Sequence, residues 1–231
     1  MRFTTVTALT TLLAVGSVSA SVLPRSLGDW DLGMPLVEER EVPALKCDST
    51  PIHIGQLKMM SSAGREVSAA FEGLRNADGY QQLGVQKAGQ PARFENFAFT
   101  PCYSSFMAYD AESNKAAEVT YGRLQPAHLQ GRRCVSADKL ADGDARLIAA
   151  QCEPSDDSAQ LLQYWSLTKQ PAAEADKFVY YVNFLGQPAG ESEDFPGSYV
   201  LSQVQKGSNK LVRLQHSKET GKRSAYFLKL T

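Results

Sequence analysis

The chain has 231 residues, 43% of them hydrophobic, and a formal net charge of −1. That length is enough for one sizeable domain with its own core, and no segment after the first residues is apolar over a length that would cross a membrane. The small net charge hides an uneven distribution, because residues 197–231 carry seven Lys and Arg against Glu219 alone. A basic end of this kind suits an anionic glycan or a membrane surface, although outward positions of a soluble sheet are the simpler interpretation.

The first twenty residues have the pattern of a secretory signal peptide. They start with Met1 and the positively charged Arg2, continue with a short apolar run, and end with small residues at 18–20. We therefore predict a signal peptide over residues 1–20 and a secreted, extracellular protein. A retained N-terminal core helix is the alternative.

Residues 21–46 form a second segment of distinct composition. It holds three prolines, two glycines and the acidic cluster Glu38-Glu39-Arg40-Glu41, and no apolar period persists along it. This composition predicts an extended leader or pro-segment, in which Trp30 is the one notable apolar residue. The folded domain is then expected over residues 47–231.

From Cys47 onward the chain breaks into short apolar runs separated by Gly, Pro, Asp, Asn and Ser. Bulky residues recur at period two in several of them, and β-branched and aromatic residues are concentrated there, as in an all-β domain. Residues 66–74 differ, since their apolar residues have helical spacing and predict a short helix or a helical turn in a loop. The expected strands lie within 52–60, 80–85, 94–99, 118–124, 133–136, 146–152, 164–167, 178–184, 199–204, 211–214 and 225–230.

Four cysteines in an exported chain most simply form two disulfides, for which three connectivities exist. Cys134 and Cys152 are close in sequence and lie on strands that we expect to pair. That pairing leaves Cys47 bonded to Cys102. The chain has no CxxC motif and its three histidines are scattered, so neither a metal site nor thiol catalysis is expected.

The segment from Cys134 to Trp165 carries the most specific motif. Its two cysteines flank a turn and an apolar strand, and the Gln-x-Trp tripeptide Gln163-Tyr164-Trp165 follows. This order resembles one repeat of a ricin-B-type (Gln-x-Trp) β-trefoil, a lectin-like family. The resemblance implies a β-trefoil with three divergent repeats of about four strands, in which Gln163 and Trp165 are structural.

Two other segments resemble the strand that begins at Trp165. Phe97-Ala98-Phe99, Trp165-Ser166-Leu167 and Tyr226-Phe227-Leu228 each read aromatic-x-apolar near the end of a block of strands. In a trefoil the three aromatic residues would point inward around a pseudo-threefold axis. A coincidence of aromatic residues in an unrelated β-sandwich is the alternative.

The resemblance also implies where a sugar would bind, and this chain departs from the family there. The family places an aspartate, an aromatic residue and an asparagine at the positions of Ser136, Ala150 and Leu162. All three departures remove a group that contacts the sugar. We therefore expect the family site of this repeat to be lost.

The other repeats contain polar and aromatic residues near expected turns, where a rigid scaffold displays binding loops. The alternative is ordinary turn chemistry, in which such residues serve only the backbone. The candidate ligand-binding residues are Asn76, Asp78 and Tyr80 in the first repeat, and Tyr181, Asn183 and Tyr199, with Asp194, in the third.

No catalytic pattern accompanies these candidates. The paired carboxylates lie in loops or in the leader rather than on rigid strands, and neither a Gly-x-Ser-x-Gly elbow nor a phosphate-binding glycine loop is present. We therefore expect a protein that is not an enzyme, with no cofactor, no metal and no nucleic-acid partner. The predicted function is non-catalytic recognition of a carbohydrate or glycoprotein. The alternative is a trefoil protease inhibitor or host-interaction factor that acts on a protein partner through loops such as 186–197.

Overall fold

The computed structural model describes residues 41–86, 95–115, 118–129, 132–140, 144–174, 177–190, 198–218 and 224–231. Residues from Glu41 onward form one compact unit. The predicted signal peptide and residues 21–40 of the predicted leader lie outside the described residues. Of that leader, only the last residues are described, and Lys46 already belongs to the first strand.

The regular secondary structure of the described residues is almost all β-strand, which confirms the all-β prediction. Two short 3-10 helices, η1 (Ser113–Lys115) and η2 (Ser158–Leu162), interrupt the strands. The strands are β1 (Lys46–Cys47), β2 (His53–Ser61), β3 (Glu66–Arg75), β4 (Gln81–Val85), β5 (Asn96–Tyr103), β6 (Val119–Pro126), β7 (Arg133–Ala137), β8 (Asp144–Gln151), β9 (Trp165–Pro171), β10 (Phe178–Phe184), β11 (Ser198–Lys206), β12 (Asn209–Ser217) and β13 (Tyr226–Leu230).

The prediction of helical structure over residues 66–74 is wrong, since this segment is strand β3. The apolar residues Val67, Ala69 and Phe71 also fit a period of two, and Ala69 and Phe71 are buried. Pairing with β2 on one side and β4 on the other, where Phe71 lies opposite Leu83, satisfies the backbone. Tertiary pairing thus decides between two periods that the local sequence allows.

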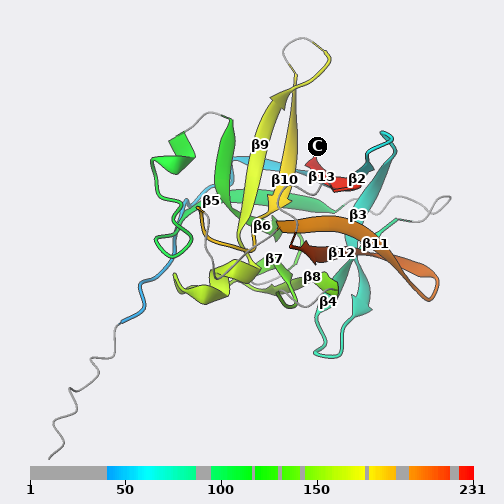
Figure 1. The fold of residues 1–231 in the computed structure, drawn as a ribbon, viewed down its shortest axis with the longest axis horizontal. Helices are drawn as coiled ribbons and strands as arrows, with labels where there is room; N and C mark the ends of the chain where they lie inside the picture. The colour runs from blue at the N-terminus through cyan, green and yellow to red at the C-terminus, as the bar shows by residue number, and fades with distance from the viewer. Residues whose placement is uncertain are drawn as a thin grey trace, which may run out of the picture. The chain divides into compact units, whose positions relative to one another are not determined.

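Six strands pair antiparallel in a closed ring. The order is β2, β5, β6, β9, β10, β13 and back to β2. The hairpins β3–β4, β7–β8 and β11–β12 each lie in sequence between two ring strands, and β4, β8 and β12 also pair with one another. Figure 1 shows β9 beside β10, with β13 and β2 nearby. A closed ring leaves no unpaired edge among its six strands.

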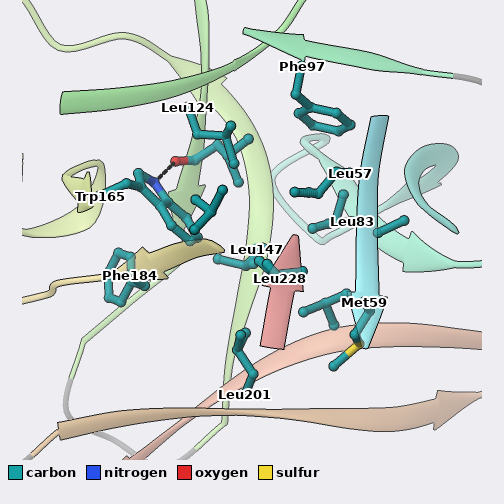
Figure 2. Packing of buried hydrophobic residues seen from close by; sticks show 14 of the residues in the cluster. Leu57, Met59, Leu83, Phe97, Leu124, Leu147, Trp165, Phe184, Leu201 and Leu228 are labelled. Atoms are coloured by element: carbon teal, nitrogen blue, oxygen red, sulfur yellow. Dashed lines mark hydrogen bonds between the residues drawn. The ribbon is translucent and has the colours of Figure 1, made fainter. Parts of the chain in front are cut away.

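The side chains that point into the ring form one core. Phe97 and Trp165 are fully buried in this cluster, and Tyr226 is partly buried against it. The indole Nε1 of Trp165 donates a hydrogen bond to the Val135 carbonyl oxygen at 2.9 Å, and the indole packs edge-on against Phe184 with ring centroids 5.2 Å apart (Figure 2). Trp165 therefore meets both requirements of a buried indole, apolar packing and a partner for its N–H.

Both expected disulfides are present. Cys134 on β7 is bonded to Cys152, which follows β8, and Cys47 on β1 is bonded to Cys102 on β5. Cys47 and Cys102 lie opposite each other in the β1–β5 pair. The first bond fastens a hairpin and the second ties the beginning of the domain to the ring.

Candidate functional site

The best candidate binding surface lies on the outside of the ring, on β10. Val182 and Phe184 point into the core and are buried. Because side chains alternate along a strand, Tyr181 and Asn183 point the other way. The two predicted residues therefore share one outward face, with Tyr181 half-buried and Asn183 exposed.

A shallow hollow of about 330 Å³ opens over this face. We call it the Tyr181 hollow; its lining residues are Met60, Thr168, Gln170, Tyr181, Asn183 and Phe227. They come from four neighbouring ring strands, since Tyr181 lies opposite Thr168 of β9, and Phe227 of β13 lies opposite Met60 of β2. The strand pairing thus gathers residues that are far apart in sequence.

The Tyr181 hollow combines apolar rings with hydrogen-bonding groups. The Phe227 side chain is 36% exposed, and none of the described residues hydrogen-bonds to the side-chain amides of Asn183 or Gln170. An aromatic face beside free amide groups suits a sugar ring, which presents C–H groups on one face and hydroxyls around its edge. The geometry therefore matches the chemistry expected of a carbohydrate site.

A cation–carboxylate cluster borders this surface. Lys229, which lies opposite Tyr181 on β13, contacts Glu66 at 2.9 Å, and Lys58 contacts the same carboxylate at 3.7 Å. The hydrogen bond and charge of Lys229, with a contribution from Lys58, lower the pKa of Glu66 below its ordinary value. Glu66 is thus held ionised, and one net positive charge remains beside the Tyr181 hollow.

Tyr199 was predicted to join Tyr181 and Asn183, but the structure places it elsewhere. Its ring packs edge-on against Phe184 at 5.2 Å and lies 5.2 Å from the His216 ring. A Cβ on Gly186 would come within 2.5 Å of the Tyr199 ring, so that glycine is required for the close approach. Tyr199 therefore supports the margin of the core, and Asp194 lies outside the described residues.

The turn between β3 and β4 contains the other predicted group. Asn76 serves the turn, because its Oδ1 accepts a hydrogen bond from the Tyr80 N–H at 2.9 Å and its Nδ2 donates to Asp78 Oδ2 at 3.2 Å. Gly79 has φ = +83°, which suits the turn that these bonds close. Asn76 is thus committed to backbone structure, as the turn interpretation predicts.

Asp78 and Tyr80 nevertheless line a hollow of their own, of about 580 Å³. We call it the Tyr80 hollow; its other lining residues are Arg75, Gly79, Gln81, Leu129, Arg133, Ala149 and Gln151. The Tyr80 ring is 38% exposed. This hollow has one aromatic residue and more charge than the Tyr181 hollow, so it is the weaker match to a neutral sugar.

The positions that contact sugar in ricin-B-type repeats are structural in this chain. The Ser136 side chain is buried, and its Oγ donates to the carbonyl oxygens of Ala137 and Leu162 at 3.0 and 3.2 Å. Ala150 offers no polar side chain, and the Leu162 side chain packs against the core. These positions therefore offer a ligand no hydrogen-bonding side chain.

Gln163 is also committed to backbone contacts. Its Oε1 accepts from the Glu153 N–H at 2.9 Å, and its Nε2 donates to the Gln151 carbonyl oxygen at 2.8 Å. The side chain thereby fastens the loop that follows β8 to the segment before β9. Gln163 and Trp165 hold the fold together and take no part in either hollow.

One buried carboxyl lies apart from these surfaces. Glu95 Oε2 accepts a hydrogen bond from the Phe71 N–H at 2.6 Å, and Oε1 lies 2.8 Å from His128 Nδ1. Burial raises the pKa of Glu95, although the Phe71 hydrogen bond and His128 oppose the shift. Among the described residues, the partners of this carboxyl are therefore a backbone N–H and a histidine.

Sequence reasoning missed Met60, Thr168, Gln170 and Phe227 of the Tyr181 hollow. The sequence signal that could have found Phe227 is the alternation of side chains along a strand, since Phe227 lies between the inward residues Tyr226 and Leu228.

The loop 186–197, proposed as a contact for a protein partner, is described only to residue 190. Among the described residues, no three His, Cys, Asp or Glu side chains form a potential metal site, and no helix is long and apolar enough to cross a membrane.

No protein-family model matches the sequence, and no curated protein is significantly similar to it.

Proposed function

We propose that this chain is a secreted, non-catalytic carbohydrate-binding protein with a β-trefoil fold similar to that of ricin-B-type lectins. The closed ring of six strands and the three hairpins that pair with one another support the trefoil. The Gln-x-Trp motif supports the family resemblance. The N-terminal sequence pattern and the two disulfides support secretion, because such bonds persist in oxidising compartments.

The observation that carries the binding proposal is the Tyr181 hollow. Two aromatic rings, Tyr181 and Phe227, lie on one outward face beside the amides of Asn183 and Gln170, to which no described residue hydrogen-bonds. The rings stack on the apolar face of a hexose while the amides bond its hydroxyls. The ligand class is a neutral sugar, free or as part of a glycoprotein.

A glycan array of neutral and anionic sugars tests this function, followed by titration calorimetry with the best ligand. Tyr181→Ala and Phe227→Ala should each weaken binding about tenfold or more, because each removes a stacking surface. Phe178→Ala is the matched control, since Phe178 is 48% exposed on the same strand but does not line the hollow. It should bind as the wild type does.

The outcomes separate the function from the site. An array without signal contradicts carbohydrate binding. If a sugar binds and only Tyr80→Ala weakens it, the function stands but the site is the Tyr80 hollow. If Phe178→Ala weakens binding as much as Tyr181→Ala, the effect is not specific to the Tyr181 hollow.

A further inference from the structure

A third hollow, of about 620 Å³, lies where β1, β5 and β6 meet the chain that follows β8. We call it the Arg123 hollow. Its charged lining residues are Arg123, Arg132 and Asp48.

Arg123 is an unusual residue to find in the wall of such a hollow. It lies on β6 between the buried residues Gly122 and Leu124, and its side chain is only 8% exposed. Its Nη2 donates to the Glu153 carbonyl oxygen and to Gln160 Oε1, the latter at 3.1 Å. Its Nε is buried, and none of the described residues accepts a hydrogen bond from it.

The charge of Arg123 is only partly compensated, because burial lowers its pKa while the nearby Glu153 carboxylate raises it. No carboxylate among the described residues forms an ion pair with it, and burial lowers its pKa to about 10. Removing a guanidinium from water without a counter-ion opposes folding, which is why buried charges are normally paired. A guanidinium whose hydrogen bonds to described residues all go to neutral oxygens can therefore take an anion that arrives from outside as a further partner.

The other polar groups define which anion fits. Arg132 is exposed at the hollow, and the Asp48 carboxylate, also on the wall, accepts a hydrogen bond from the Tyr103 hydroxyl at 2.9 Å. Two guanidinium groups and one carboxylate give the side chains that line the hollow a formal charge of +1, a count that does not include the Glu153 carboxylate. A singly charged anion neutralises that charge, whereas a doubly charged phosphate would leave an excess negative charge beside Asp48.

We propose that the Arg123 hollow binds a carboxylate group, held by the guanidinium of Arg123 and attracted by Arg132. Arginine forms strong charge-assisted hydrogen bonds with a carboxylate, and because both Nη2 hydrogens are donated within the protein, Nη1 is the nitrogen left for the ligand. Thr100 and Gln125, which bond each other at 3.1 Å, also line the hollow and offer neutral polar groups to the rest of the ligand. This site is separate from the Tyr181 hollow and does not depend on the function proposed for it.

Two sources supply a carboxylate of this kind, an acidic sugar and the C-terminus of a peptide. Calorimetry or ligand-observed NMR of the full chain should use sodium glucuronate against its uncharged amide, and N-acetyl-Ala-Ala against its carboxamide. At least one carboxylate should bind, and its uncharged partner should bind about tenfold more weakly or not at all. The pair that binds identifies the source.

Variants place the binding in the hollow. Arg123→Gln should reduce the affinity about tenfold or more, and Arg132→Gln about threefold, since the second side chain is exposed. Arg65→Gln makes the same charge change outside this hollow and should leave the affinity unchanged. Circular dichroism checks the fold of each variant. If Arg123→Gln is unfolded, the affinities of Arg132→Gln and Arg132→Glu test the proposal in its place.

Three results would overturn the proposal. The first is that neither carboxylate binds the wild type. The second is that the uncharged compounds bind as well as the acids. The third is that Arg65→Gln weakens binding as much as Arg132→Gln, which would attribute the attraction to overall charge rather than to the Arg123 hollow.

Discussion

Replacing Trp165 by Phe and by Ala tests how the core is held together. Trp165 is fully buried, its Nε1 donates to the Val135 carbonyl oxygen at 2.9 Å, and its ring packs against Phe184. Trp165→Phe removes the hydrogen bond, leaves the carbonyl oxygen without that donor, and removes part of the ring volume. We expect a loss of about 2–3 kcal/mol in the free energy of unfolding.

Trp165→Ala removes the remaining ring as well. Truncation of a buried aromatic residue to Ala costs about 3–5 kcal/mol before the lost hydrogen bond is added, so we expect about 5 kcal/mol or more. A loss of that size is comparable with the whole stability of an ordinary domain. Trp165→Ala should therefore be largely unfolded under conditions in which Trp165→Phe is folded.

Equilibrium urea unfolding followed by far-UV circular dichroism measures these differences without depending on tryptophan fluorescence. Phe178→Ala is the control, because that ring is 48% exposed and contacts the Lys169 ammonium at 3.8 Å; it should change stability by no more than about 1 kcal/mol. Equal stability of Trp165→Phe and wild type would refute the role of the indole hydrogen bond. Equal losses in the two Trp165 variants would refute the packing contribution.

Three further predictions concern other parts of the domain, each measured by thermal or urea unfolding. Replacing Cys134 and Cys152 together by Ser should cost about 3 kcal/mol, because the closed loop is short; no change would contradict its role in constraining the unfolded chain. Gly122→Ala should cost about 3 kcal/mol or more, because a Cβ there would lie 2.1 Å from the Thr100 carbonyl oxygen, and a neutral effect would contradict the β5–β6 approach. The raised pKa of Glu95 means that the native state binds a proton more tightly than the unfolded state, so this group's contribution to stability falls as pH rises above about 4.5. Glu95→Gln should therefore gain stability over wild type as pH rises, and a constant difference between the two would contradict this.

Much of the fold could be predicted because its signals are local. Alternation in 178–184 predicts the strand that the structure shows as β10, in which Val182 and Phe184 are buried and Tyr181 and Asn183 face outward. The Cys134–Cys152 bond follows from two cysteines on neighbouring strands. These inferences need only the period of a strand and the length of a turn.

The errors occur where pairing between distant segments decides. Residues 66–74 fit a helix and a strand alike, and only β2 and β4 on either side make the strand the stable choice. Tyr199 is of a residue type that is common in binding sites, yet its ring packs against Phe184. Phe227 adjoins Asn183 and Tyr181 only because β13 pairs with β10. None of these neighbours is visible along one strand.

The two proposed sites differ in how they relate to folding. The Tyr181 hollow lowers the stability of the fold little, because outward positions of a ring strand tolerate exposed aromatic residues singly or in small groups. Arg123 is different, since a buried guanidinium with an unpaired Nε lowers the stability of the free protein. Residues that lower the stability of a fold, such as buried unpaired charges, are found mainly at functional sites. Because the buried guanidinium opposes folding, Arg123→Gln should be as stable as wild type or more stable when no ligand is present. A carboxylate ligand that raises the unfolding temperature of wild type, but not that of Arg123→Gln, would show that the unpaired charge is retained for binding.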